Sequence, residues 1–143
     1  MPNGRNKGVI MFYDYAFSIA ANTTSAAGLT LDMPVDYGVL TRLDVHFPPG
    51  CCGLVYVVVE RFVHQLFPSN VTGKFRSDNE TVIVNCEYDI IDKPFSLTVR
   101  GWNYDTRYSH TIDVRLTLKK RESGLIVIAN ATDDLLKELQ GGK

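Results

Sequence analysis

Cysteine is scarce in this chain, and neither a long hydrophobic run nor an excess of one charge is present. Only three cysteines occur among the 143 residues, at Cys51, Cys52 and Cys86. An odd number cannot form a complete disulfide framework, and no CxxC or HxxxH pattern accompanies the adjacent pair as a zinc site would require. We therefore expect free thiols in a reducing compartment, with a bridge from Cys86 to Cys51 or Cys52 as the alternative.

The charges of the chain almost cancel. Fifteen Lys and Arg residues against 16 Asp and Glu residues give a formal net charge of -1. A protein that binds nucleic acid by neutralising phosphates needs a basic surface, and this composition gives no support for one. No apolar run is long enough to span a bilayer. The sequence thus predicts neither a nucleic acid nor a membrane as partner.

The signatures of the common enzyme classes are also missing. The chain has no GxSxG elbow, no Walker A motif and no GxGxxG motif. His46, His64 and His110 lie in three separate segments without an HxH pair, so a metal-dependent, cupin-like enzyme is a minor alternative. We expect a non-enzymatic protein with no catalytic residues, no metal and no cofactor.

Short stretches of alternating apolar and polar residues make up most of the sequence. Side chains of a strand point to opposite faces in turn, so alternation predicts strands that are buried on one face. The predicted strands are residues 11–19, 29–33, 39–47, 81–86, 95–99 and 112–118, together with the apolar run 54–63, which is typical of the middle of a sheet. Seven or eight strands separated by turn signals predict an all-β, antiparallel β-sandwich, either a jelly roll or an immunoglobulin-like Greek key.

Residues 95–118 contain the clearest pair of strands and the best candidates for a binding site. Two alternating runs flank a polar segment, which predicts an antiparallel hairpin. Aromatic residues and arginine at its tip are the types that dominate binding hot spots, and Tyr and Trp also stack on sugar rings. The candidates are Trp102, Tyr104, Arg107, Tyr108 and His110. In the alternative interpretation, Trp102 and Tyr108 fold back to cover the open end of the sandwich.

We expect a single domain with an extension at each end. Residues 1–8 (MPNGRNKG) are not followed by the apolar stretch of a secretory signal peptide and are expected to be a flexible arm. Residues 9–129 are expected to form the sandwich, and residues 130–143 an amphipathic helix, which Gly141 and Gly142 stop, and a tail. Leu135, Leu136 and Leu139 share one face of that helix and are further candidates for partner binding.

Three segments carry a resemblance to known proteins: LTRLDVHFPPGC, HQLFPSN and FSLTVRGWNYDTRYSHTIDVRL. Over about residues 39–118 the chain resembles small uncharacterised proteins encoded among the structural genes of tailed bacteriophages. The resemblance implies an all-β virion component, a capsid decoration or accessory protein that acts through contact area and symmetry. Its implied partners are other copies of the chain, as in a trimer, and virion proteins such as the major capsid protein.

The residues also support a second function of a different class. A carbohydrate-binding, lectin-like module would use Trp102, Tyr104 and Tyr108 as a platform for a glycan. In that case, replacing Trp102 by alanine should abolish glycan binding without unfolding the protein.

Overall fold

Strands dominate the computed structural model, which describes residues 9–120, and no α-helix occurs in that range. The elements are β1 (Ile10–Ile19), the 3-10 helix η1 (Ser25–Ala27), β2 (Leu29–Pro34), β3 (Gly38–Phe47), β4 (Val55–Arg61), β5 (His64–Phe67), β6 (Glu80–Ile90), β7 (Ser96–Asn103) and β8 (His110–Lys119). The all-β prediction is confirmed. The predicted arm at 1–8 and the helix that would carry Leu135, Leu136 and Leu139 lie outside the described residues.

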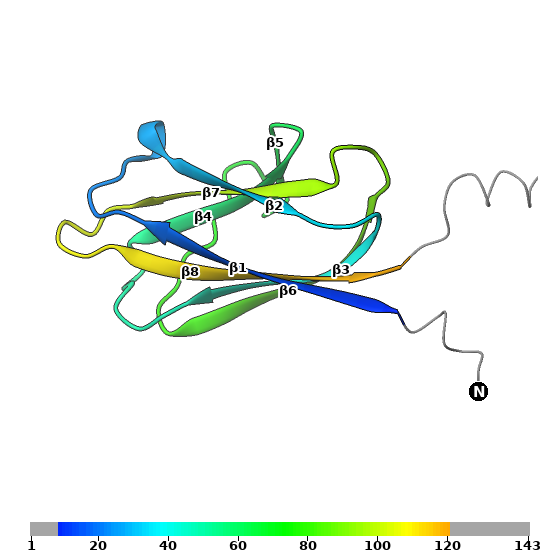
Figure 1. The fold of residues 1–143 in the computed structure, drawn as a ribbon. Coiled ribbons are helices and arrows are strands. Elements are labelled where there is room, and N and C mark those ends of the chain that lie inside the picture. The colour runs from blue at the N-terminus through cyan, green and yellow to red at the C-terminus, as the bar shows by residue number, and fades with distance from the viewer. Residues whose placement is uncertain (1–8, 121–143) are drawn as a thin grey trace, which may run out of the picture.

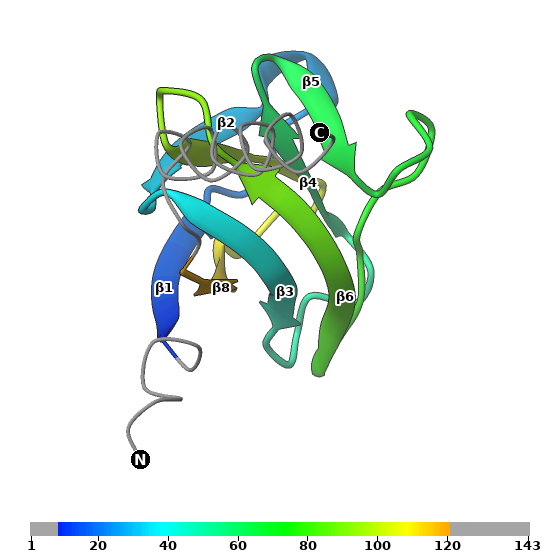
Figure 2. The same cartoon turned by 90° about the vertical axis from the view of Figure 1, so that its right-hand side faces the viewer.

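The strands pair like a long hairpin that is folded over on itself. β1 pairs with β8, β2 with β7, β3 with β6 and β4 with β5, all antiparallel. Two further pairings, β3 with β8 and β4 with β7, join these hairpin layers into sheets of order β1-β8-β3-β6 and β2-β7-β4-β5. The two four-stranded sheets stack face to face (Figures 1 and 2). This is the eight-stranded arrangement of a jelly roll, which decides between the two predicted topologies.

The hydrophobic core lies between the two sheets. Because the pleat turns every second side chain inward, each long strand supplies a row of buried residues. β8 supplies Ile112, Val114, Leu116 and Leu118, each 0% exposed. Each such side chain contributes roughly 1.5–3 kcal/mol through removal from water. β4 lies between β7 and β5, as its apolar run predicted, and its outward-facing Val58 is covered as well.

The predicted hairpin at residues 95–118 is wrong. β7 belongs to the β2-β7-β4-β5 sheet and β8 to the other sheet, and residues 104–109 cross between them as an arch. Alternation shows that a strand has one apolar face, but it does not say which sheet the strand joins. Here the apolar faces of the two strands oppose each other across the core. We call this end of the sandwich the arch pole.

The opposite end, which we call the terminal pole, is where the described chain begins and ends. Ile10 of β1 lies opposite Lys119 of β8, and the Lys120 amide donates to the Val9 carbonyl at 3.1 Å. In Figure 1 the start of β1 (blue) and the end of β8 (orange) therefore lie together at the right. Val9 and Lys120, the first and last of the described residues, therefore lie at the same pole.

The turn between β4 and β5 also lies at the terminal pole and has an unusual backbone. Its two residues, Phe62 and Val63, both have positive φ, at 55° and 67°. Turns of this kind normally use Asn-Gly, because a β-branched side chain is strained at positive φ. Phe62 is 48% exposed and Val63 is 92% exposed. The turn thus presents two apolar side chains to solvent on a strained backbone.

Candidate ligand-binding groove

The structure separates the five predicted binding residues into two groups. Trp102 lies on the outer face of β7, and Tyr104 follows that strand directly. Arg107 and Tyr108 are exposed on the arch, and His110 begins β8. The first group lines a hollow in the surface. The second group, Arg107, Tyr108 and His110, surrounds Asp105 and forms hydrogen bonds with it that stabilise the arch.

Asp105 organises the arch. Its Oδ1 accepts hydrogen bonds from the amides of Arg107 at 2.9 Å and Tyr108 at 3.3 Å, and its Oδ2 lies 2.8 Å from His110 Nε2. The bond from the Arg107 amide, followed by that from the His110 side chain, lowers the pKa of Asp105 below its usual value. The His110 side chain is only 9% exposed. His110 therefore acts as a structural partner of Asp105.

Acid should loosen the arch through Asp105. Because the folded-state pKa of Asp105 is lowered, its contribution to stability is present above the unfolded pKa of about 3.9 and is lost as the pH falls through the folded value. We expect Asp105→Asn to be less stable than the wild type at neutral pH, with a gap that narrows as the pH falls. Urea denaturation across this range measures the gap. The exposed Asp92→Asn is the control, and a gap that does not change with pH would contradict the prediction.

A groove lies on the outer face of the β2-β7-β4-β5 sheet, close to the arch pole. Its volume is about 450 Å³, within the range of roughly 300–1,000 Å³ typical of small-ligand sites. It is lined by Ser25, Ala26, Tyr56, Lys74, Arg100, Trp102 and Tyr104. These residues come from η1, β4, β7, the arch and the connection from β5 to β6. The fold thus collects in one place residues that are far apart in the sequence.

The register of β4 and β7 places the aromatic residues of the groove. Tyr56 lies opposite Trp102, and their rings are stacked with centroids 5.7 Å apart and planes 3° apart. Tyr104 meets Tyr56 edge-on, with centroids 5.5 Å apart. Trp102 is only 4% exposed, whereas Tyr104 is 44% exposed. Trp102 is thus covered, but on the outer face of a sheet and not over the end of the sandwich, so Tyr104 is the more accessible ring.

Cations surround these aromatic rings. The Arg100 guanidinium lies 5.1 Å from the centroid of the Trp102 ring, and the Arg76 guanidinium lies 5.2 Å from that of the Tyr56 ring. Lys74 Nζ donates to the carbonyl of Val71 at 2.8 Å. None of the ion pairs formed within residues 9–120 involves Lys74, Arg76 or Arg100. The groove therefore carries positive charge that no carboxylate of the described chain neutralises.

The sequence prediction missed Tyr56, Lys74, Arg76 and Arg100. Arg100 and Trp102 are two residues apart on β7, so strand alternation places both side chains on the outer face of the sheet. The position of Arg100 beside Trp102 could therefore have been predicted from the sequence. Tyr56 lies in an apolar run on another strand, and its position beside Trp102 depends on the β4–β7 register. Lys74 and Arg76 lie in an irregular connection, where the sequence holds no comparable signal.

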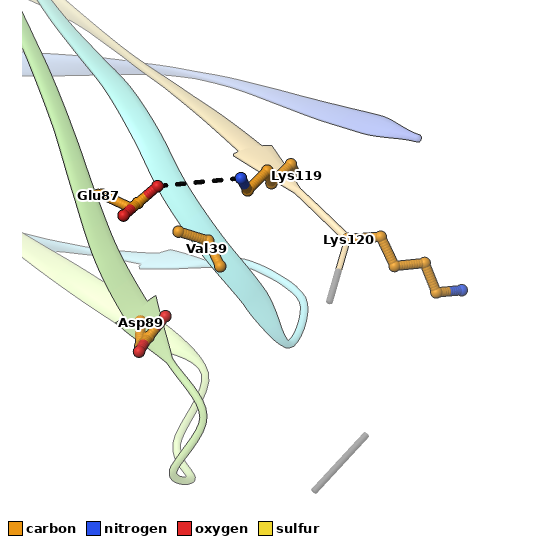
Figure 3. A pocket seen from close by; sticks show the side chains of 5 residues that line it. All are labelled: Val39, Glu87, Asp89, Lys119 and Lys120. Atoms are coloured by element: carbon orange, nitrogen blue, oxygen red, sulfur yellow. Dashed lines mark ion pairs between the residues drawn. The ribbon is translucent and has the colours of Figure 1, made fainter. Parts of the chain in front are cut away.

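A second hollow lies at the terminal pole, on the outer face of the β1-β8-β3-β6 sheet. It measures about 310 Å³ and is lined by Val39, Glu87, Asp89, Lys119 and Lys120 (Figure 3). Lys119 Nζ lies 3.9 Å from Glu87 Oε2, and Figure 3 shows these side chains pointing toward each other near Val39. Acidic and basic side chains balance here, so this hollow has no preference for a ligand of one charge.

The cysteines and histidines are dispersed. The three cysteines are free thiols, with Cys51 buried and Cys52 exposed. Burial, with the nearby Asp78 carboxylate, raises the pKa of Cys51 to about 11. His46 bonds to Thr81, and within residues 9–120 no group of three or more His, Cys, Asp or Glu side chains is placed to hold a metal ion. The same part of the chain has no helix with the length and apolar character of a membrane span.

Comparison with known proteins adds little to this description. No known protein family matches the chain, and no curated protein matches it significantly. A solved structure from Bacillus endospore appendages, described as a novel family of disulfide-linked pili, is similar over 78% of this chain and 89% of its own, with 13% sequence identity and a TM-score of 0.37. With a TM-score this low, the assignment of the chain to the jelly rolls is based on its strand order alone.

Proposed function

We propose that this chain is a non-enzymatic structural protein in the virion of a tailed bacteriophage. In this role it is a capsid decoration or accessory protein that binds neighbouring capsid subunits and other copies of itself. The sequence resemblance over residues 39–118 suggests this role. The jelly-roll fold supports it, since viral capsid proteins use this fold, although lectins and cupins use it as well.

The observation that carries the proposal is the composition of the terminal pole. Val9 and Lys120, where the described part of the chain begins and ends, both lie at this pole. Six of the twelve large exposed apolar and aromatic side chains of residues 9–120 lie at this pole, at the start of β1, in the β4–β5 turn and after β6, and exposed apolar side chains can form part of an interaction site. They are Val9, Ile10, Phe12, Phe62, Val63 and Ile91, with exposed fractions from 39% to 92%. A pole with this composition supports the proposal that the protein attaches by one end.

Removing the extensions should weaken assembly without unfolding the sandwich. We expect the full chain to form a defined oligomer, such as a trimer, by light scattering. Variants that lack residues 1–8 or residues 121–143 should dissociate at higher protein concentration while keeping the melting temperature of the sandwich. This follows because the paired strands β1 and β8 lie within residues 9–120. Assembly that is unchanged in both truncated variants would contradict the proposal.

A matched pair of point variants tests the pole itself. Phe12 on β1 and Tyr108 on the arch are both 61% exposed, but they lie at opposite poles. Phe12→Ser should weaken the oligomer, and Tyr108→Ser should leave it intact. Equal effects of the two variants would show that exposed aromatic side chains drive association without regard to the pole.

A further inference from the structure

We propose that the groove beside the arch pole binds an acidic saccharide, one whose sugar rings carry carboxylate or sulfate groups. This function is separate from attachment through the terminal pole. The groove is formed by the outer face of the β2-β7-β4-β5 sheet, whereas the chain ends belong to strands of the other sheet. A protein attached by its terminal pole would leave this groove open to solvent.

The guanidinium groups of Arg100, which lines the groove, and of Arg76, which lies against Tyr56 beside it, have unused capacity to bind an anion. An arginine has five N–H donors in a planar fork that matches a carboxylate or sulfate. Within the described residues, Arg100 uses one hydrogen bond, to the carbonyl of Ser25, and Arg76 uses one, to the hydroxyl of Tyr56. Most of their donors are thus left for a ligand. Because no carboxylate competes for them, an anionic group of the ligand would be their first ion-pair partner.

The position of Arg100 is fixed before any ligand arrives. Its guanidinium lies between the Trp102 ring and Gly28, where an added Cβ would stand only 3.2 Å from Arg100 Nε. A glycine at this position therefore leaves room for the arginine to lie flat against the backbone. A site in which the charged group is already held in place loses less entropy on binding.

The aromatic residues add a surface for the ring of a sugar. Tyr104 is 44% exposed at the edge of the groove and is braced edge-on by Tyr56. The C–H face of a pyranose can pack on such a ring while its acidic substituent reaches the guanidinium groups. Trp102 supports Tyr56 from below the surface and is not itself the platform. Of the three platform residues that the sequence suggested, Tyr104 is therefore the one that offers a ring to a sugar in the groove.

A single-stranded nucleic acid is a poorer match. Proteins that bind it stack successive bases on several exposed aromatic rings and follow the backbone along a positively charged groove. This groove offers one well-exposed ring and two lining cations, Lys74 and Arg100, with Arg76 beside Tyr56, on a chain whose net charge is -1. The small number of cations matches the few negative charges of a short acidic saccharide.

The test is a binding titration of the full chain with three saccharide probes of similar length. We expect an oligogalacturonate or a sulfated heparin-type oligosaccharide to bind, with affinity that falls as salt rises, and a neutral malto-oligosaccharide not to bind. A preference between the two acidic probes would identify the acidic group. Failure of both acidic probes, or equal binding of the neutral one, would overturn the proposal, as would tighter binding of a single-stranded oligonucleotide.

Two matched pairs of variants locate the site. Arg100→Gln, a change at the arginine that lines the groove, should weaken binding of the acidic probe about tenfold or more, whereas Arg107→Gln, the same change on the arch, should leave it within about twofold. Tyr104→Ala should likewise weaken binding, and Tyr108→Ala should not. If Arg107→Gln and Tyr108→Ala weaken binding as much as Arg100→Gln and Tyr104→Ala do, binding is a general effect of charge or takes place elsewhere on the arch, and the groove is excluded as the site.

Discussion

Replacing Asn103 by alanine should destabilise the fold by about 3 kcal/mol. Asn103 is 0% exposed and is a polar side chain that points between the sheets at the arch pole. Its Nδ2 donates to the carbonyls of Ile19 at 3.2 Å and Tyr108 at 2.9 Å, and its Oδ1 accepts from the Asp105 amide at 2.8 Å. The side chain thus ties the end of β1 to both sides of the arch. Alanine would leave these backbone groups without partners where water has little access.

Urea denaturation of two further variants isolates the cause of that loss. Asn103→Asp keeps the shape of the side chain but removes both donors, so it should be at least as destabilising near neutral pH. Asn85→Ala, an exposed position on β6, should change the free energy of unfolding by less than about 0.5 kcal/mol. A loss below about 1 kcal/mol in Asn103→Ala would show that the arch does not depend on this side chain.

Gly101 should be nearly as intolerant of change, for a steric reason. An added Cβ would stand 2.7 Å from Ile19 Cδ1, 3.0 Å from Phe17 Cε2 and 3.0 Å from the Tyr56 carbonyl oxygen. The first two atoms belong to β1 on the opposite sheet, and the third is backbone of the neighbouring strand. Gly101→Ala should therefore cost about 2 kcal/mol in the free energy of unfolding through overpacking.

A second substitution should rescue the Gly101 variant. Ile19→Val removes Cδ1, the atom nearest to the added methyl group. Alone it should cost about 0.5–1.5 kcal/mol, yet the double variant should be more stable than additivity of the two changes predicts. Gly53→Ala is the control, because Gly53 has φ +71° and no atom within 4 Å of its added Cβ, so only backbone strain of about 1 kcal/mol applies. Strict additivity of Gly101→Ala and Ile19→Val would contradict the proposed clash.

Much of this fold could be predicted because its strands alternate cleanly. The β8 residues from Ile112 to Leu118 point inward at every second position, as their pattern indicated. The sheet to which each strand belongs could not be predicted. β7 and β8 are close in sequence but pair with β2 and β1, and these partners depend on contacts made across most of the chain. The expected hairpin failed because short connections in a jelly roll can cross between sheets as well as turn within one.

The residues of the candidate site could likewise be predicted only in part from the sequence. Trp102 and Tyr104 were identified by residue type, and both line the groove. Tyr56, which completes the aromatic surface, is brought to Trp102 by strand register, which a single sequence does not reveal. The burial of Asn103, in contrast, could have been predicted from its position along the strand. This residue lies in the polar segment between the predicted strands 95–99 and 112–118, and its burial follows from its even spacing with Leu97 and Val99 along β7.

The pairing of the first strand with the last also determines how the molecule bears force. Tension applied between Val9 and Lys120 would act at the Ile10–Lys119 end of the β1–β8 ladder and open it one pair at a time, like a zipper. Tension carried from both chain ends together toward the arch pole would instead run along the strands and load many hydrogen bonds at once, in shear. A molecule tethered by both ends and pulled at its far pole would therefore resist far more strongly than one stretched between its own ends.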